Sequence, residues 1–311
     1  MEKSKLNFFS HSNLDRVSEL RLDENWLQVQ LQNEASNFLL IHQQKVLISQ
    51  TNKSILFFQY TDIQRFELKD KPFLLGIEEN QIFFCLDVSQ HLASNWEHLG
   101  KFEELRPLAL YLSDKQANMI AHARAMAHWH RTNRFCGVCG NQTIVQESGY
   151  KITCLHCSTS FFPRTDSAII VQITHQDKCL LVRQPQWDKG RYANVAGFLE
   201  PAETLESAVR REIKEETGLI VSNIQYHSSQ PWAFPASIML GFTAEAENAN
   251  VTLDRTELED FMWVTRKEMV EKLQNEEISL PFRFSISYRL IEDWFDEKTF
   301  EGRNLHFYLS T

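Results

Sequence analysis

The sequence predicts an α+β protein in which a β-rich amino-terminal domain and a larger α/β domain flank a short cysteine-rich module. Three observations support this fold class. Short β-prone runs fill the first part of the chain, two C-x-x-C pairs follow, and strand-like runs then alternate with segments of helical spacing. A chain of 311 residues, 43% of them hydrophobic, is long enough to form about two cores.

Changes in the residue pattern place the domain boundaries. We expect the β-rich domain at residues 1–112, a connecting helix at 113–133, the cysteine module at 134–162 and the second domain at 163–311. The connecting helix is expected because Ala, Met, Ile and His recur there at helical spacing. No motif in the first domain carries chemistry, so the sequence assigns that domain no role beyond packing.

Strands of the β-rich domain are expected at residues 26–32, 55–60, 73–77 and 82–88. Residues 26–32 alternate apolar and polar side chains, which is the period of a half-buried strand. The other three runs are rich in Ile, Leu and Phe, and the last two are expected to pair across a turn at residues 78–80.

The second domain is expected to alternate strands with helices. We expect strands at residues 168–173, 180–182, 238–244 and 261–264, a helix that starts near Leu205, and a final helix at residues 285–295. The first helix should end at Gly218, because glycine is the residue that most readily adopts the left-handed conformation after a helix.

The charge and the terminal residues exclude several classes of protein. A formal net charge of −9 provides no broad basic surface for nucleic acid or for an anionic membrane. A polyanionic substrate would therefore have to be held locally, by metal ions. No apolar run approaches the ~20 residues that span a bilayer, and the first residues lack the pattern of an export signal. We expect a cytoplasmic protein that has no membrane partner.

The cysteine module has the spacing of a zinc site. Its pairs are Cys136-x-x-Cys139 and Cys154-x-x-Cys157, separated by fourteen residues. Four thiolates complete a tetrahedral sphere and leave no position for water, so we expect one structural zinc ion per chain. Two unrelated cysteine pairs or a disulfide framework are the weaker alternatives. A cysteine module of this kind is called a zinc ribbon. Zinc ribbons also bind nucleic acid, but few basic residues lie in the turns that contain these cysteines.

A second candidate metal site lies on the helix that starts near Leu205. Its glutamates Glu212, Glu215 and Glu216 are three and four residues apart, so their carboxylates share one helix face. The carboxylates repel one another unless cations neutralise them, and hard divalent ions prefer such oxygen clusters. An acidic face in contact with solvent is the alternative interpretation, and the glycines at both ends of the segment disfavour it.

This segment resembles a known family. Residues 197–219, GFLEPAETLESAVRREIKEETGL, fill every defining position of the Nudix box, including Gly197, Glu203 and Arg211. Residues 229–237, SQPWAFPAS, resemble the SQPWPFPxS signature of the NADH pyrophosphatase branch. Ala233 departs from that signature, which usually has proline there, and should loosen the loop slightly. The resemblance implies that the second domain is a Nudix α/β/α sandwich.

The resemblance also implies a set of catalytic metal ligands. In this family, glutamates of the box and a loop carbonyl bind Mg²⁺ or Mn²⁺. The corresponding residues here are Glu212, Glu215, Glu216 and the carbonyl of Ala196, with Glu216 as the first choice for the essential ligand. A further carboxylate usually assists, and Glu257 is the candidate, although a surface acidic patch explains it equally well. Arg211 is expected to orient Glu203 or its neighbours.

Substrate-binding residues follow from the same resemblance. Aromatic rings that correspond to Phe162, Phe198 and Trp232 lie against the substrate base, and Trp232 is the best placed of them for stacking. The further candidates for substrate contacts are Gln230, Ser237 and Ser287. Packing within a core is the alternative for each aromatic residue. Family members are homodimers, and the resemblance implies a dimer here.

The implied activity is hydrolysis of the pyrophosphate bond of NAD(H), which yields nicotinamide mononucleotide and AMP. Metal-activated water would attack this bond. Removal of NAD caps from RNA 5′ ends uses the same chemistry and is an alternative. An alternative from another class is a non-catalytic Nudix-like regulator that senses nucleotides, but such proteins typically lose glutamates that this box retains.

Overall fold

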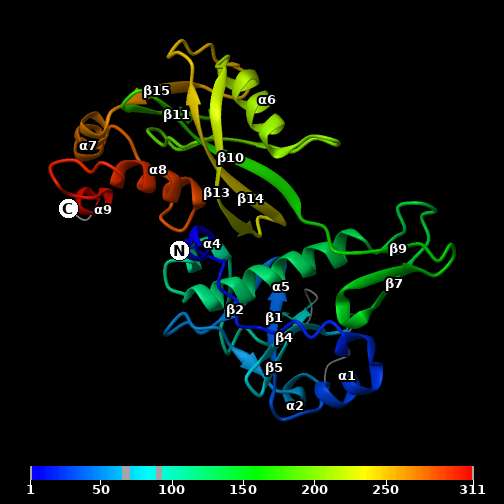
Figure 1. Ribbon diagram of the computed structural model, residues 1–311. Coiled ribbons are helices and arrows are strands. Elements are labelled where there is room, and N and C mark those ends of the chain that lie inside the picture. Colours follow the sequence, from blue (N-terminus) through cyan, green and yellow to red (C-terminus); the bar gives the residue numbers. More distant parts are fainter. Residues whose placement is uncertain (1, 65–70, 89–92, 310–311) are drawn as a thin grey trace. The chain divides into compact units, whose positions relative to one another are not determined.

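The computed structural model describes residues 2–64, 71–88 and 93–309, which divide into two compact units (Figure 1). The carboxyl-terminal unit consists of Met1–Phe8, Asp166–Gln230 and Ser237–Thr311. The amino-terminal unit consists of Phe9–Thr165 and the short segment Pro231–Ala236. The amino-terminal unit therefore includes six residues from much later in the chain, within the motif at residues 229–237.

The amino-terminal unit contains a six-stranded sheet among the described residues, with the order β4-β5-β1-β2-β6 and β3 paired to β1. The strands are β1 (Ser36–His42), β2 (Lys45–Ile48), β3 (Phe57–Phe58), β4 (Phe73–Glu78), β5 (Gln81–Asp87) and β6 (Lys101–Glu103). β1 and β5 are parallel, and the pairs β1–β2, β1–β3, β2–β6 and β4–β5 are antiparallel. The strands expected at 73–77 and 82–88 are confirmed, whereas only two residues of 55–60 form a strand.

The strand expected at residues 26–32 is wrong, because this segment belongs to helix α1 (Glu24–Leu31). The Asp23 carboxylate caps the helix by accepting hydrogen bonds from the backbone N–H groups of Asn25 and Trp26 at 2.9 and 3.0 Å. Leu27 and Leu31 are four residues apart, so both lie on one helix face and pack against the core. Alternation over seven residues therefore fits either structure, and the cap favours the helix.

Helix α5 (Asp114–Thr132) confirms the helix expected after the β-rich region. Ser113 and Gln116 form a capping box at its start. A short helix, α4 (Leu105–Leu108), precedes it, and a three-stranded sheet follows it. The strands of that sheet are β7 (Thr143–Gln146), β8 (Lys151–Cys154) and β9 (Ser160–Phe161).

The carboxyl-terminal unit contains a second six-stranded sheet among the described residues, with the order β13-β14-β10-β11-β15 and β12 paired to β10. The strands are β10 (Asp166–His175), β11 (Lys178–Arg183), β12 (Val195–Phe198), β13 (Val221–Trp232), β14 (Ser237–Ala246) and β15 (Asp260–Val264). β10 and β14 are parallel, whereas β11 and β12 pair with β10 in the antiparallel direction. The expected strands are confirmed, but β13 and its extension to Trp232 were not expected.

Helices cover both faces of this sheet, as expected for an α/β/α sandwich (Figure 1). Ile169 and Val171 of β10 pack with residues of α6 (Leu205–Thr217). Ile170 lies between them in sequence and packs with Ile286 and Leu290 of α8 (Ile286–Asp296). Because successive side chains of a strand point to opposite faces, α6 and α8 lie on opposite sides of the sheet.

The ends of α6 are fixed by its own sequence. The Thr204 side chain caps its start by accepting from the Ser207 N–H at 3.2 Å. Gly218 ends it in the left-handed conformation with φ of 70°, as expected. The remaining helices of this unit are α7 (Arg266–Gln274), which was not expected, and α9 (Leu305–Tyr308). In the described part of the chain, no helix combines the length and the apolar character needed to cross a membrane.

Candidate active site and zinc centre

The first glycine of the box, Gly197, lies directly against Glu212. A Cβ atom at position 197 would overlap the Glu212 carboxylate. Gly197 belongs to β12, which pairs with the central strand β10. The Glu212 carboxylate therefore lies against a strand of the sheet. Glycine here lets the Glu212 side chain approach closely, and any larger residue would displace that carboxylate.

Helix α6 separates its apolar and acidic residues by burial. Val209 and Ile213 are fully buried in the core of the unit, and only 4% of the surface of Glu216 is exposed. The side chains of Glu212 and Glu215 are 13% and 59% exposed. The acidic face thus runs from a buried carboxyl group at Glu216 to a group in contact with solvent at Glu215.

The segment that follows β14 is attached to the end of α6. The backbone N–H groups of Thr252 and Asp254 donate to the carbonyl oxygens of Thr217 and Glu216, at 2.8 and 3.0 Å. These bonds satisfy carbonyl groups that a helix leaves without partners at its end. They also bring Glu257, three residues after Asp254, toward the buried carboxyl group.

The electrostatics of Glu216 reflect this crowding. Burial, and then the negative charges of Glu212, Glu257, Asp254 and Glu215, together raise the pKa of Glu216 to about 8. Burial also raises the pKa of Glu212, while Arg211 opposes that shift. A buried carboxylate surrounded by like charges becomes stable when a cation binds, and a donor set of oxygen atoms alone suits a hard divalent ion.

Arg211 connects several parts of the box. Its Nε and Nη2 donate to the two carboxylate oxygens of Glu203, and Nη2 also donates to the carbonyl oxygen of Phe198. Its Nη1 lies 2.9 Å from Glu212 Oε1 and 3.0 Å from Glu215 Oε2. Hydrogen bonds from Arg211, and then from the backbone of Glu200, lower the pKa of Glu203 to about 2. The expectation that Arg211 orients Glu203 is confirmed.

The candidate aromatic residues are divided between the two units. Phe198, in the carboxyl-terminal unit, is 62% exposed, and Phe162, in the amino-terminal unit, is 59% exposed. Trp232 is half-buried and belongs to the amino-terminal unit through the segment Pro231–Ala236. Exposure of the two phenylalanine rings disfavours core packing as their role.

Trp232 is held by an aromatic cluster of the amino-terminal unit. Its ring lies 4.9 Å from that of Phe234, and the Phe9 ring meets both edge-on at 6.3 and 6.2 Å. The Arg106 guanidinium lies 4.8 Å from the Phe234 ring centroid and 5.9 Å from that of Trp232. Phe9 itself is fixed to α5, since Asp114 accepts from its N–H and Asn118 donates to its carbonyl oxygen. Phe9 and Arg106 belong to no motif in the sequence and were not predicted as site residues.

The other predicted substrate residues differ in their surroundings. Gln230 is fully buried, and its amide donates to the carbonyl oxygens of Phe8 and Phe284 and accepts from the Ile286 N–H. Ser287 donates to Asn194 Oδ1 at 2.7 Å. Ser237 opens β14, and Ala196 lies in strand β12 rather than in a loop. Gln230 and Ser287 therefore use polar atoms to connect α8 to the rest of the unit.

Sequence patterns also did not reveal two polar networks in this unit. Asn194 donates to Gln172 Oε1 at 2.9 Å, which extends the Ser287 contact into the sheet. His227 Nε2 lies 2.8 Å from Asp293 Oδ2. Both contacts join residues that are far apart in the sequence, so no local motif predicts them.

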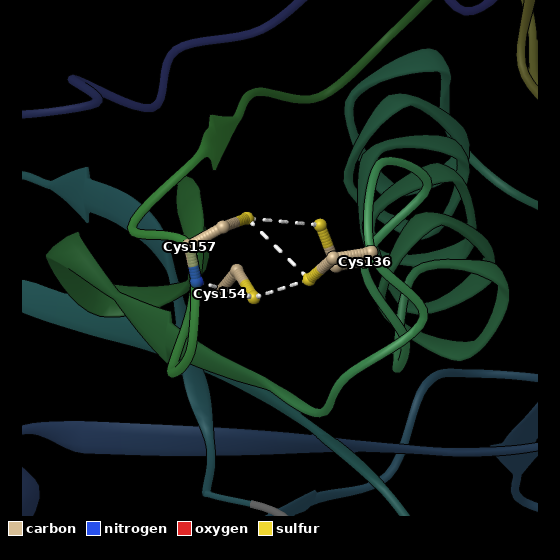
Figure 2. A group of neighbouring side chains, drawn as sticks. Cys136, Cys154 and Cys157 are labelled. Atoms are coloured by element: carbon tan, nitrogen blue, oxygen red, sulfur yellow. Dashed lines mark hydrogen bonds between the residues drawn. The ribbon is translucent and has the colours of Figure 1, made fainter.

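The four cysteines of the ribbon converge as their spacing predicts. Figure 2 shows the sulfur atoms of Cys136, Cys154 and Cys157 pointing toward one another. The Sγ–Sγ separations are 3.6 Å for Cys136–Cys157 and 3.5 Å for both Cys139–Cys154 and Cys139–Cys157. Four thiolates around a zinc ion at ~2.3 Å stand about 3.8 Å apart, so the site fits zinc.

The remaining cysteines do not take part. Cys85 and Cys179 are fully buried, and burial raises the pKa of both thiols. Among the described residues, the four ribbon cysteines are the one group of metal-ligand residues whose ligand atoms all lie within 4.8 Å of one another.

Comparisons with known proteins agree with this architecture. The family model described as NUDIX domain matches residues 163–283. Two more match residues 35–129 and 131–162, and they are described as NADH pyrophosphatase-like rudimentary NUDIX domain and NADH pyrophosphatase zinc ribbon domain. The fold and the glutamates of α6, together with these matches, define the protein as a Nudix hydrolase with a zinc ribbon.

Curated relatives narrow this class. The chain is 33% identical to a Homo sapiens protein named NAD-capped RNA hydrolase NUDT12, over 93% of this chain and 73% of the relative. It is 38% identical to a Photobacterium profundum protein named NAD-capped RNA hydrolase NudC, over 57% of this chain and 66% of the relative. The chain therefore belongs to the NADH pyrophosphatase branch of the Nudix hydrolases. A solved Nudix hydrolase from Nitrosomonas europaea is 20% identical, covering 53% of this chain and 92% of its own, with a TM-score of 0.45.

Proposed function

We propose that this protein hydrolyses the pyrophosphate bond of NAD(H) and releases AMP and nicotinamide mononucleotide, oxidised or reduced. The observation that carries this proposal is the buried Glu216 carboxyl group, whose neighbours Glu212, Glu257, Asp254 and Glu215 all carry like charge. Such a group is suited to binding divalent cations next to a diphosphate. Its position in a complete Nudix box supports the bond type.

Glu212, Glu215, Glu216 and Glu257, with the Ala196 carbonyl, would hold Mg²⁺ or Mn²⁺. When bound, these ions neutralise the diphosphate and lower the pKa of the attacking water. The protein's own contribution is to hold the ligands in place. Gly197 admits the Glu212 carboxylate, and Arg211 fixes Glu203 and neutralises part of the charge on Glu212 and Glu215.

Substrate recognition is proposed for Phe162, Phe198 and Trp232, whose rings offer flat faces to a base. Gln230, Ser237 and Ser287 would support the bound base. For Gln230 and Ser287, the hydrogen bonds to Ile286 and Asn194 favour an indirect role through the position of α8. A homodimer in the cytoplasm remains the proposed form of the protein.

Removal of NAD caps from RNA is the second candidate function, because the relatives at 33% and 38% identity are named NAD-capped RNA hydrolases. It requires the same hydrolysis of a phosphoanhydride bond, with a nucleotide chain in place of the free AMP end. A non-catalytic regulator is disfavoured, since the glutamates of the box are all retained.

A product assay tests the proposal. Purified protein with Mg²⁺ or Mn²⁺ is offered NADH, NAD, ADP-ribose, diadenosine polyphosphates and NAD-capped RNA in separate reactions, and nucleotide products are separated by chromatography. The proposal predicts AMP and nicotinamide mononucleotide from NADH or NAD, with metal dependence. Hydrolysis of ADP-ribose or of diadenosine polyphosphates alone would contradict the assigned substrate.

A further inference from the structure

A pocket of about 370 Å³ in the amino-terminal unit has no role in the proposed hydrolysis. It lies where the last turn of α5 meets β4, the end of β5 and the ribbon strands β7 and β8. Its volume is within the range of pockets that bind small organic groups. Its lining combines charged side chains with aromatic and aliphatic ones.

The charge of this pocket is opposite to that of the chain. Among the described residues that line it, Lys71, Arg131 and Arg134 are the cations and Asp87 is the one carboxylate. Arg131 Nε lies 3.8 Å from Asp87 Oδ2, and the arginine side chain remains 33% exposed. In a protein of net charge −9, a concave surface with three cations concentrates positive potential locally and attracts anions.

The ordinary explanation for basic residues at this point is the helix dipole. A cation in the last turn of a helix is favoured by the negative end of the dipole, and this accounts for Arg131 in α5. It does not account for Lys71, which precedes β4, or for Arg134, which follows the helix. The helix dipole thus accounts for one of the three cations that line the pocket.

An aromatic ring marks the rim of the pocket. Phe135 directly follows Arg134, lines the pocket and is 63% exposed. A backbone bridge to Gln142, another lining residue, fixes its position at the start of the ribbon. Exposed aromatic rings beside cations are the usual means of binding single-stranded nucleic acid, because the ring stacks on a base while the cations bind phosphates.

We propose that this pocket binds a phosphodiester and the adjacent base of single-stranded RNA. Arg131, Arg134 and Lys71 would contact phosphate oxygens, and Phe135 would stack on the base. All three cations lie outside the two cysteine turns at residues 136–139 and 154–157, which contain few basic residues. The RNA would be the strand that follows an NAD cap. This identification rests on the proposed function, in which NAD-capped RNA is a candidate substrate.

The test measures binding of a fluorescent, uncapped RNA of ten nucleotides by anisotropy, at salt concentrations between 50 and 200 mM. The paired substitution Arg131→Gln with Arg134→Gln is compared with the unchanged protein. Each phosphate contact contributes about 0.7 to the slope of log affinity against log salt for single strands. We expect the pair to weaken binding about tenfold at low salt and to reduce that slope by about 1.4.

Matched variants separate local from general effects. Lys267→Gln with Arg303→Gln removes two exposed cations from the other unit and should leave the affinity and the slope unchanged. Arg131→Lys keeps a point charge that phosphate accepts, so it should retain most of the affinity even if the contact with Asp87 changes. Phe135→Ala should weaken binding with no change in the salt slope, because stacking releases no counterions.

Unchanged RNA affinity and salt slope in the paired variant would overturn the proposal. Loss of inorganic phosphate binding, measured by calorimetry, with RNA binding retained would also overturn it, in favour of a site for free phosphate. A change in molecular mass on substitution would instead show an interface between copies of the chain.

Activity assays connect the pocket to the enzyme. The paired variant should lose kcat/KM on NAD-capped RNA by the same factor of about ten, while hydrolysis of NADH stays unchanged and serves as the check of folding. Failure to hydrolyse NADH in the unchanged protein would reject the proposed function but leave the RNA-binding result standing.

Discussion

The Arg211 guanidinium and the Glu203 carboxylate form a two-point contact, with Nε to Oε1 at 2.7 Å and Nη2 to Oε2 at 2.9 Å. The pair joins α6 to the loop that precedes it, and the bond from Nη2 to the Phe198 carbonyl oxygen adds strand β12. A fork of parallel donors fixes both distance and angle, which a single ammonium group does not. These contacts fix the acidic face of α6 relative to the strand that contains Gly197.

Replacing this fork tests its positioning role. Arg211→Lys keeps the charge but offers no planar pair of donors, so we expect hydrolysis of NADH to fall by about 10- to 100-fold. Steady-state rates across a Mn²⁺ titration measure the effect, and the required metal concentration should rise. Arg210→Lys is the matched control, because Arg210 is exposed and donates to the Glu206 carbonyl oxygen. Equal rates for both variants would contradict the role of the fork.

Arg106 offers a test of what the amino-terminal unit does. Its guanidinium lies over the Phe234 and Trp232 rings, and an exposed contact of this type contributes about 0.5–1 kcal/mol. Arg106→Gln should therefore raise KM for NADH about 2- to 5-fold with kcat nearly unchanged. Arg303→Gln, which removes a guanidinium from over the Phe307 ring, is the control. A fall in kcat with KM unchanged would show that Trp232 does not act in binding.

Loss of one ribbon cysteine should release zinc before it affects catalysis. Cys154→Ser is expected to lower bound zinc from about one ion per chain and to lower the thermal midpoint, because the ion stabilises the folded ribbon. Metal analysis by mass spectrometry and thermal melting measure the two effects. In Cys85→Ala, a buried thiol outside the ribbon is removed, and zinc content should be unchanged. Full zinc content in Cys154→Ser would show that four sulfurs are not needed.

The lowered pKa of His122 predicts that acid destabilises the amino-terminal unit. Its Nε2 lies 2.8 Å from the Tyr150 hydroxyl, and burial, followed by the charges of Arg16 and Arg21, lowers its pKa to about 3. In the unfolded chain His122 binds a proton near pH 6.5, whereas in the folded chain it stays neutral down to about pH 3. The stability that depends on neutral His122 is therefore fully present above pH 6.5 and is lost as the pH falls toward 3.

His122→Gln removes this titration and keeps a polar group beside Tyr150. We expect the unfolding free energy of the unchanged protein to fall by about 1–2 kcal/mol more than that of the variant between pH 7 and pH 5. Urea unfolding at the two pH values measures this difference. Parallel pH dependence in the two proteins would contradict the shifted pKa.

Local signals explain which elements the sequence predicted. The start, periodicity and glycine end of α6 are all encoded within its own segment, so the helix and its acidic face were predicted from Leu205 to Gly218. The strand prediction for residues 26–32 was wrong because seven alternating positions fit a strand, while the Asp23 cap that starts the helix lies outside them. The placement of Trp232 with Phe9 and Arg106 was not predictable, because contacts between distant aromatic residues leave no spacing in the sequence.

We propose that the buried carboxyl group of Glu216 helps to hold the divalent ions on which dinucleotide hydrolysis depends. Mn²⁺ binding, followed by electron paramagnetic resonance alongside AMP release from NADH, tests it in the unchanged protein and in Glu216→Gln, with the exposed Glu206→Gln as control. We predict that Glu216→Gln weakens Mn²⁺ binding and lowers the rate about 10³-fold or more, while the metal-free variant melts no lower than the unchanged protein at pH 8.5. Full activity in Glu216→Gln, or no bound Mn²⁺ in the unchanged protein with dinucleotide present, would contradict the claim.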